Sequence, residues 1–580
     1  MSVFTDDDDN GDLGLLPLSS SSPPYPSNPL SLPPAPATTT SVQHVTNPSL
    51  SFRRPPSSPV RSNTLPRTAR RRSTQIALAP AEGSVQLEPE KLARLRGWIL
   101  GLVTVNFDLD VGPVIDSIQP YLLLSSSDSE NIAFSSFPDS PQFDQGSQCH
   151  SFRIRDSGHV EERALRNFGR GAPSDGFVYG YCHFTQQRDS TSKRGYRQTS
   201  LVILTHHPYP ALFQTIISIL GPMYQQHGSP MLETACHNIA NWPDSTPGNT
   251  VELGFLGSAL QVGLPMHSDE QQSRESLPLS ERNAPFHVLA STPSQSPPIL
   301  PLFEASLSHL WSIWECLVLC EPILIFAPSP DSTSQAVWWF RDILRPIPMA
   351  SDFRPYFTIH DQDHAALVNK MPPKAGLLLG VTNPLIERAC RHWPHILSLG
   401  SHAKLVARSP PSRADKPSKG KTMFTAAGPH PGWATKTHNR YISKDRALLK
   451  QLEEACQGGH QAKSEASQLL RRHFSSRTTA LLVPLNRYLN TLIPSPAESA
   501  SSLTSTLRLK PFSTSDFFSS LKAHGAQLPF RSKHKQKEFY ERWLRTPAFG
   551  LWLAKQEEVV QRVLRENAER RVSSVYSPRV

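Results

Sequence analysis

The sequence predicts three folded modules: an α+β module, an α/β module with a mostly parallel sheet, and an α-helical module, all preceded by a disordered arm. Three observations predict this order. Residues 91–265 contain apolar strands followed by helices, residues 301–400 alternate short apolar strands with helices, and residues 441–572 carry apolar residues at helical spacing. Alternating strands and helices predict a parallel sheet, because each crossover places a helix on a face of the sheet.

The α/β module, residues 301–400, opens with an amphipathic helix. In LSHLWSIWECLVLC, large apolar side chains recur at three- and four-residue steps from Leu307 to Val318, which places them on one helical face. This helix is expected to stop at Glu321, because a residue before proline is pushed out of the helical region. The other expected elements are strands at residues 323–326, 353–360 and 376–381, and helices capped at Asp331 and Asn383.

The α+β module, residues 91–265, is expected to be an antiparallel sheet followed by two helices. The stretch WILGLVTVNFDLDVGPVIDSIQP alternates apolar and polar residues on both sides of a turn, which predicts a hairpin. Further strands are expected at residues 151–155, 177–184 and 199–207, and helices in PYPALFQTIISIL and MLETACHNIANWP. Residues 266–300 are rich in serine, proline and glutamine, which predicts a loop between modules.

The helical module, residues 441–572, follows a basic proline-rich linker at residues 401–440. Leucines from Leu448 to Leu452 share one face of its first helix. A later helix is expected to be capped by Ser515 and Asp516, and Pro547 should divide the final helix pair.

The arm, residues 1–90, is acidic at residues 6–9 and then rich in serine and proline. Such a segment buries too little apolar area to offset its ordering entropy, so we expect it to be disordered. Its second half is rich in arginine and contains RRRS at residues 70–73. A solvated tether is one interpretation of this run, and a membrane or partner tether tuned by phosphorylation of Ser73 is the other.

Composition narrows the class of protein. The net charge of +10 over 580 residues fits attraction to an acidic membrane surface or an acidic partner, and is weaker than a nucleic-acid-binding protein would show. The seven cysteines are scattered and odd in number, which predicts reduced thiols in a cytoplasmic protein. No apolar run is long enough to span a bilayer, so membrane contact is expected to be peripheral.

Motifs for catalysis or metal binding are incomplete. His360 and His364 have the spacing of a zinc-protease pair, but the glutamate that serves as base is absent. Residues 420–422 lack the earlier glycine of a phosphate loop, and Cys316 and Cys320 lack the further cysteines or histidines of a zinc site. A loop, a linker and core thiols are the simpler interpretations, so no catalytic residue, metal or cofactor is expected.

Several multi-residue strings resemble one known family. EPILIFAPSP, DFRPYFTIHD, GVTNP and HWPHIL in residues 301–400, with FDLDVGP and SKRGYRQTSLVIL earlier, are similar to DENN-domain proteins, in particular to the DENN-domain-containing protein 6 group. The resemblance covers roughly residues 95–552. It implies a longin-like upstream DENN module at residues 91–265, a central DENN module at residues 301–400 and a downstream helical DENN module at residues 441–572.

DENN proteins are guanine-nucleotide exchange factors for Rab GTPases. The resemblance therefore implies a regulator without covalent chemistry that binds a Rab and promotes GDP release on endosomal or other trafficking membranes. Tighter binding to the nucleotide-free GTPase must weaken nucleotide affinity by the same factor. The alternative is a non-catalytic scaffold that binds a small GTPase in trafficking or cell polarity. A hydrolase that uses His360 and His364 is a third interpretation, and it would require bound zinc.

The resemblance places the GTPase in the groove between the first two modules. Candidate partner-binding residues are polar side chains at loop ends beside the matching strings: Arg188, Lys193 and Arg194 in the first module, and Asp331, Asp352, Arg354, Asp361 and Asn383 in the second. Asp331 and Asn383 have a second interpretation, because both stand where helix caps belong.

Overall fold

The computed structural model describes residues 85–141, 143–156, 175–193, 195–273, 287–400, 429–495 and 509–576, with side chains as far as residue 566. Most of the predicted arm and residues 401–428 of the predicted linker lie outside this part. Residues 85–90, which the sequence assigned to the arm, are folded. Val85 is buried and its N–H donates to Gln119 Oε1 at 2.8 Å, and helix α1 begins at Pro89.

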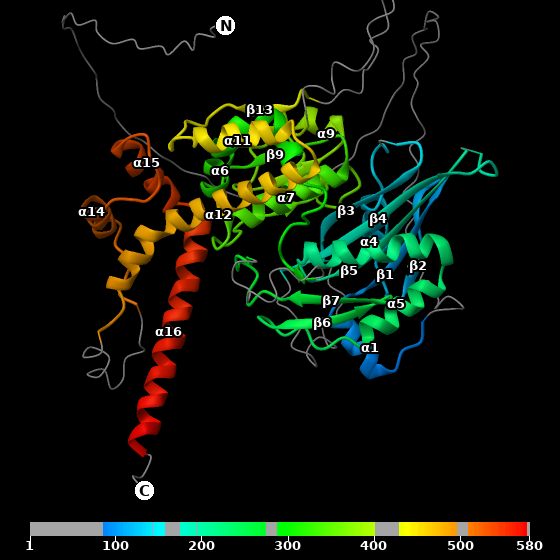
Figure 1. The fold of residues 1–580 in the computed structure, drawn as a ribbon, viewed down its shortest axis with the longest axis horizontal. Coiled ribbons are helices and arrows are strands. Elements are labelled where there is room, and N and C mark those ends of the chain that lie inside the picture. Colours follow the sequence, from blue (N-terminus) through cyan, green and yellow to red (C-terminus); the bar gives the residue numbers. More distant parts are fainter. Residues whose placement is uncertain are drawn as a thin grey trace, which may run out of the picture. The chain divides into compact units, whose positions relative to one another are not determined.

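The first sheet is antiparallel, in the order β2-β1-β5-β4-β3 (Figure 1). Its strands are β1 (Gly101–Asp108), β2 (Gly112–Gln119), β3 (Gly146–Arg155), β4 (Phe177–Arg188) and β5 (Tyr196–Thr205). Helices pack on both faces: α1 (Pro89–Arg96), α4 (Pro210–His227) and α5 (Pro230–Ala240) on one, and α2 (Ser126–Ser135), which was not predicted, on the other. Alternation along β5 explains the two faces, since Ile203 joins the α4 side and Val202 the α2 side.

A small second sheet follows, in the order β6-β7-β8. Its strands are β6 (Thr250–Phe255), β7 (Ser258–Gly263) and β8 (His287–Leu289). None of these was predicted, and β8 falls inside the predicted inter-module loop. The β6–β7 turn has φ of +46° at Leu256 and +82° at Gly257, the two-residue geometry that matches strand twist. A strand of three residues, such as β8, is too short to show a hydrophobic period.

The central sheet has the order β10-β11-β9-β12-β13, with parallel pairing except between β12 and β13. Its strands are β9 (Ile323–Phe326), β10 (Phe353–Arg354), β11 (Leu378–Val381), β12 (His395–Ser398) and β13 (Gly432–Thr435). The expected strand at residues 353–360 is therefore only two residues long. Strand β13 lies in the predicted linker, where GWAT carries no periodic signal.

Helices cover the central sheet, and three details of this region differ from the sequence prediction. They are the 3-10 helix η2 (Leu300–His309), α6 (Leu310–Val318), α7 (Pro330–Leu344), α8 (His364–Leu367) and α9 (Pro384–Ala389). Helix α6 ends three residues before the predicted stop, because Cys320 turns left-handed at φ +53°. Ser329, not Asp331, caps α7. The predicted loop at residues 266–300 also includes buried Ile299 and Leu300. Asn383 caps α9 as predicted.

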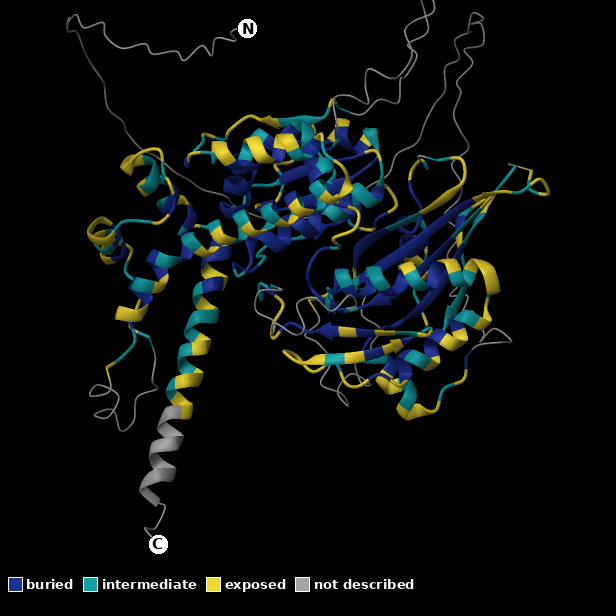
Figure 2. Ribbon diagram, in the orientation of Figure 1, coloured by how far each residue is buried: buried dark blue, intermediate teal, exposed yellow. Residues whose placement is uncertain are grey.

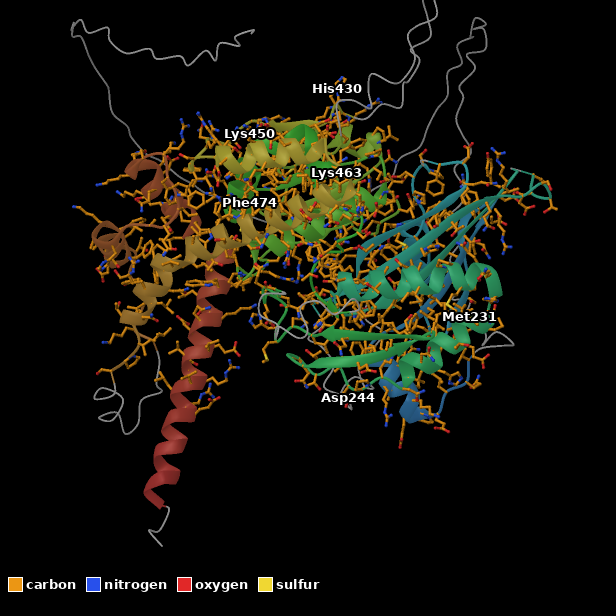
Figure 3. All side chains as sticks on the ribbon, viewed as in Figure 1. Met231, Asp244, His430, Lys450, Lys463 and Phe474 are labelled. Carbon is orange, nitrogen blue, oxygen red and sulfur yellow. The ribbon has the colours of Figure 1, made fainter. Side chains whose placement is uncertain are left out.

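The last part of the chain is helical. Its helices are α11 (Arg446–Cys456), α12 (His460–Thr491), α14 (Thr514–His524), α15 (Lys533–Trp543) and α16 (Pro547–Tyr576). Pro547 divides the final pair as predicted, but Ser513 rather than Ser515 or Asp516 caps α14. Helix α12 packs along α7, and its Phe474, labelled in Figure 3, lies 5.6 Å from Trp311 and 6.1 Å from Trp339 between ring centroids.

Burial follows these layers: the strands of both large sheets are mostly buried, while α16 is increasingly exposed beyond Trp552 (Figure 2). Among the helices in the described ranges, none has the length and apolarity needed to cross a membrane.

Candidate functional site

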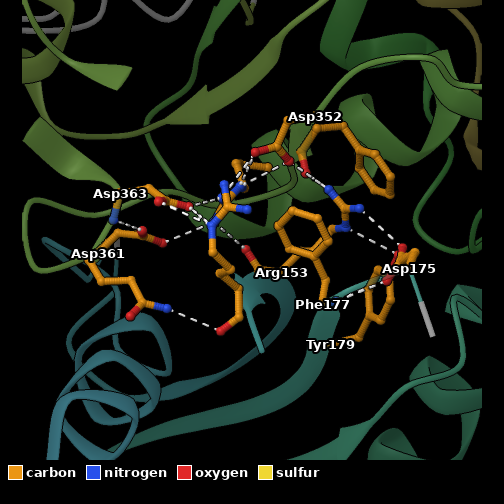
Figure 4. Close-up of polar contacts among 11 residues, drawn as sticks. Arg153, Asp175, Phe177, Tyr179, Asp352, Asp361 and Asp363 are labelled. Carbon is orange, nitrogen blue, oxygen red and sulfur yellow. Dashed lines mark hydrogen bonds and ion pairs between the residues drawn. The ribbon is translucent and has the colours of Figure 1, made fainter. Parts of the chain in front are cut away.

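Arg153 of β3 reaches from the first sheet to the central sheet (Figure 4). Its Nη1 donates to Asp352 Oδ1 at 2.6 Å and to the Phe353 carbonyl at 3.2 Å, and its Nη2 donates to Asp175 Oδ2 at 3.0 Å. The guanidinium also lies 3.4 Å from the centroid of the Phe177 ring. One buried cation therefore joins residues about 200 positions apart, and its planar fork suits several acceptors at once.

Arg354 of β10 completes the connection from the central side and is fully buried. Its Nε donates to both Asp352 oxygens at 3.1 and 3.0 Å, and its Nη1 donates to Asp361 Oδ2 at 3.3 Å and to the Arg153 carbonyl at 3.1 Å. Asp363 contacts both Arg354 and Arg155. We call these seven residues the junction cluster: Arg153, Arg155, Asp175, Asp352, Arg354, Asp361 and Asp363.

The inner part of the junction cluster, around Arg354 and Asp361, holds its charges away from water, whereas Arg155 and Asp175 are partly exposed. Burial raises the pKa of Asp361, and Arg354 only partly offsets this. Burial also pushes the pKa of Asp363 upward, but the ion pairs with Arg354 and Arg155 outweigh it, so that pKa lies below its usual value. Burial lowers the pKa of Arg354, yet Asp352 and Asp361 outweigh it and raise that pKa. Ion pairing in the cluster therefore favours the charged forms of Arg354 and Asp363, while burial disfavours the charged form of Asp361.

A second contact zone lies beside α2. The Tyr356 hydroxyl donates to the Phe137 carbonyl at 3.0 Å and accepts from the Asp139 N–H at 3.2 Å, and its ring is buried in the core of the first sheet. The hydroxyl of Thr382, at the end of β11, contacts the Asp139 carboxylate. Tyr356 therefore anchors the central sheet to the outer layer of the first sheet.

Exposed apolar side chains border this second zone. Phe134 of α2 stacks on His360 with 3.5 Å between ring centroids, and a Cβ added at Gly112 would lie 3.4 Å from the same phenylalanine. Four of the exposed apolar residues near these contacts form what we call the junction rim: Leu109 (47% exposed), Val111 (69%), Ile359 (43%) and Leu385 (63%). Ile359 and Leu385 lie within three residues of contacts between the two sheets, at His360 and Thr382, and Leu109 and Val111 lie within three residues of Gly112, which faces Phe134. Exposed apolar groups of this kind are suited to contact with another protein.

A pocket of about 980 Å³ opens at the far end of the β4–β5 hairpin. Its lining is mostly polar and includes Asn106, Asp144, Tyr196 and Arg197. Arg188, at the end of β4, pairs with Asp144 at 3.5 Å and is 64% exposed. Lys193, in the turn between β4 and β5, is also exposed, while Arg194 lies outside the described residues. Arg188 and Lys193 therefore belong to the hairpin end rather than to the junction cluster.

The central candidates divide into buried and accessible groups. Asp352, Arg354 and Asp361 are brought together, but inside the junction cluster, so a partner cannot reach Arg354 or Asp361 in this structure. Asn383 uses its side chain to accept from the Leu385 N–H at 2.9 Å, as a helix cap. Asp331 is half-buried and accepts from Gln335 Nε2 at 2.9 Å; burial raises its pKa to about 6.

Arg153 and Tyr356 were missed by reasoning from the sequence. The sequence could have pointed to Arg153, because a charged residue between Phe152 and Ile154 in an apolar strand requires a buried partner. No sequence pattern pointed to the contacts of Tyr356. The His360 and His364 rings pack on Phe134 and Phe357 respectively, at a turn and at the start of α8, which is not the helical arrangement of a zinc protease.

Comparison with known proteins identifies the family. No family model matches the chain. Human protein DENND6B is 33% identical over 476 residues, which cover 79% of each chain. Mouse protein DENND6A is 31% identical over 508 residues, covering 84% of this chain and 83% of the relative. A DENND6 homolog of Dictyostelium discoideum is 28% identical over 534 residues, covering 80% and 72%. With such identity over most of its length, the chain belongs to the DENND6 group of DENN-domain proteins.

Proposed function

We propose that this protein is a guanine-nucleotide exchange factor for a Rab GTPase. The observation that carries the proposal is membership of the DENND6 group over 79% of the chain, since DENN proteins are regulators of this kind. On this proposal, residues 91–265 are the longin-like upstream module, residues 301–400 the central module with its mostly parallel sheet, and residues 441–572 the downstream helical module. The antiparallel first sheet and the four parallel strands β10, β11, β9 and β12 support that division.

The proposed exchange site is the surface around the junction rim. A Rab would bury the exposed side chains of Leu109, Val111, Ile359 and Leu385 beneath its switch regions. The junction cluster would hold the two sheets in a fixed relative orientation below this surface. A fixed surface matters because exchange depends on binding the nucleotide-free GTPase more tightly than the nucleotide-bound one, and that difference equals the loss of nucleotide affinity.

Polar candidates take separate roles in this proposal. Asn383 stands beside Leu385 and is only half-buried, so it can contact the Rab while it caps α9. Arg188 and Lys193 lie at the hairpin end, and these two residues together with Arg194 are proposed to contact acidic groups of the Rab or of a trafficking membrane. Asp352, Arg354 and Asp361 are assigned to positioning the modules and not to direct contact.

The test is nucleotide release by the full-length chain across the complete set of Rab proteins of its source organism. Each Rab is loaded with fluorescent GDP and mixed with a substoichiometric amount of the chain and excess GTP. We expect faster release from at least one Rab, with many turnovers per chain, because GTP entry frees the exchange factor. If no Rab responds and one binds stably in its GTP form, the protein is a scaffold and the proposal fails.

A further inference from the structure

Cys316 and Glu321 are brought together by the way helix α6 ends. Cys320 adopts the left-handed φ of +53°, the Cys320 N–H donates to the Leu317 carbonyl at 3.1 Å, and the Glu321 N–H donates to the Cys316 carbonyl at 2.8 Å. This is the hydrogen-bond pattern of a Schellman turn. The turn folds the chain back on itself, so that the thiol of Cys316 and the carboxylate of Glu321 lie on the same side of the helix end.

His438 joins this pair from the segment after β13. The Cys316 sulfur, one Glu321 carboxylate oxygen and one His438 ring nitrogen all lie within 4.8 Å of one another. The cluster sits between the central sheet and the helical part of the chain, because Glu321 precedes β9 and also accepts from Arg542 of α15 at 2.5 Å. Three residues that are far apart in the sequence thus present a thiol, a carboxylate and an imidazole to one small volume.

The His438 ring is buried and held in an orientation that suits a metal ligand. Its side chain is only 2% exposed, and its Nε2 lies 2.7 Å from Glu315 Oε2. Glu315 is itself fixed, since it accepts from the backbone N–H groups of Tyr441 and Ile442 at 3.0 and 2.6 Å. A proton on Nε2 that is donated to Glu315 leaves Nδ1 with a lone pair. That buried Nδ1 has no partner among the residues that the structure describes.

Such an arrangement is the one that metal-binding histidines adopt, with a carboxylate on the ring nitrogen that does not bind the metal. A buried nitrogen without a partner is otherwise unfavourable, by about 1–3 kcal/mol. Thiolate, imidazole and carboxylate together suit zinc, which favours tetrahedral coordination by sulfur, nitrogen and oxygen. His395 of β12 contacts the Glu321 carboxylate through Nε2, while its Nδ1 lies 2.9 Å from Thr435 Oγ1.

We propose that Cys316, Glu321 and His438 bind a zinc ion through one atom each, while His395 holds the Glu321 carboxylate in place. Binding would release the thiol proton of Cys316 to solvent, because the thiolate is the form that binds metal. The two charges of the ion are then balanced by the thiolate and by the Glu321 carboxylate. Arg542, which is 41% exposed, provides the countercharge to Glu321 without the ion and can turn to solvent when it binds. The site would link the end of helix α6 to the segment that follows β13.

The first test measures zinc in the full-length chain, purified from zinc-supplemented cells without a histidine tag, by mass spectrometry of the metal. We expect about one zinc per chain, because three protein ligands leave one position of a tetrahedral zinc for water. The Cys316→Ser/His438→Gln double variant should lose it. Cys390→Ser, which alters another buried cysteine, and His360→Gln should keep it. Zinc absent from the wild type, or retained by the double variant, overturns the proposal.

A second measurement does not depend on whether the variants fold. Zinc is removed from the wild-type chain with a chelator and cobalt(II) is added alone. Thiolate coordination should give a sulfur-to-cobalt charge-transfer absorption together with the strong visible bands of a tetrahedral site, and one equivalent of zinc should abolish both. Cobalt spectra without a thiolate band would show that Cys316 is a core thiol and would overturn the proposal.

Discussion

The central sheet contacts its two neighbours through different balances of charged and aromatic side chains. Toward the first sheet, the junction cluster places three guanidinium groups among four carboxylates. Toward the helical part, most of the contact is aromatic: Trp314 stacks near Phe539 at 6.5 Å between centroids, and Trp311 meets Phe474 at 5.6 Å, beside the ion pairs of Arg542 with Glu321 and of Arg471 with Asp342. We call this second contact the aromatic seam.

The two contacts contribute differently to the relative orientation of the modules and to the stability of the fold. A buried ion-pair network gains little net free energy, because desolvation offsets most of the attraction, but its hydrogen bonds fix distances and directions. Buried aromatic side chains contribute stability roughly in proportion to the apolar area they remove from water, with looser directional requirements. The junction cluster therefore sets how the proposed Rab-binding surface is assembled, while the aromatic seam mainly stabilises the fold.

The largest expected effect comes from breaking the junction cluster on one side. Arg354→Met leaves Asp352, Asp361 and Asp363 without their shared partner, which should lower the free energy of unfolding by about 3–5 kcal/mol at pH 7. The loss should shrink at acidic pH, where the carboxylates can be protonated. Urea unfolding at pH 7 and pH 4.5 measures both values. An equal loss at the two pH values would show that packing, not charge, explains the effect.

A smaller, pH-independent effect is expected at the aromatic seam. Trp314→Phe removes the hydrogen bond from Trp314 Nε1 to Thr478 Oγ1 and part of a fully buried ring, at a cost of about 1–3 kcal/mol. Thr478 still donates to the Ile343 carbonyl, so no polar group is left without a partner. The same urea experiment should give one value at both pH values and in high salt. If the loss of unfolding free energy in Trp314→Phe depended strongly on pH, the proposed difference between the junction cluster and the aromatic seam would be wrong.

Two carboxylates should show opposite pH signatures. Burial raises the pKa of Asp331 to about 6, so the folded state holds the proton more tightly and stability falls as the pH rises from about 4 to 6. Asp331→Asn should therefore raise the melting temperature at pH 7 and leave it nearly unchanged at pH 4.

Asp363 provides the matched control. Its lowered pKa contributes stability that is present above its unfolded value, about 4, and is lost as the pH falls through the lower folded value. Asp363→Asn should lower the melting temperature at pH 7, with a difference that shrinks on acidification. Thermal scans from pH 3 to pH 7 give both curves. Shifts of the same sign for the two variants at pH 7 would contradict this electrostatic assignment.

The smallest effect is expected outside both contacts. Deleting residues 1–83, or replacing residues 407–427 by a short glycine-serine chain, should leave the melting temperature unchanged, because these stretches lack periodic apolar residues. Both changes spare the folded neighbours Val85 and Pro429, whose backbone atoms are hydrogen-bonded. A large fall in either case would reveal a packed element.

Local patterns predicted most helices and strands but not the contacts between them. Period and capping found β9, α7 and the Asn383 cap, since each depends on neighbours in sequence. The strand β13 has four residues and depends on β12 for its pairing, so no period could show it. Candidate residues at loop ends included Arg354, yet its partners are chosen by tertiary packing, which turned a proposed contact residue into a buried one.

Only part of the proposed site could be predicted from the sequence. A charge in an apolar strand could have pointed to Arg153, but its partner Asp352 is 199 residues away. The junction rim could not be predicted, because Ile359 and Leu385 belong to apolar stretches that look like core. Their exposure follows from the early end of β10 and from the position of α9, which only the folded chain determines.

The most direct test of the account is GDP release by junction-rim variants from the Rab that responds best. Ile359→Asp and Leu385→Asp change exposed side chains, so they should fold normally and reduce kcat/KM at least about tenfold, which corresponds to about 1.4 kcal/mol. Val563→Asp on α16, 46% exposed, is the matched control and should keep the wild-type rate. Wild-type release by both rim variants, or an equal loss in the control, would contradict the assignment of exchange to this surface.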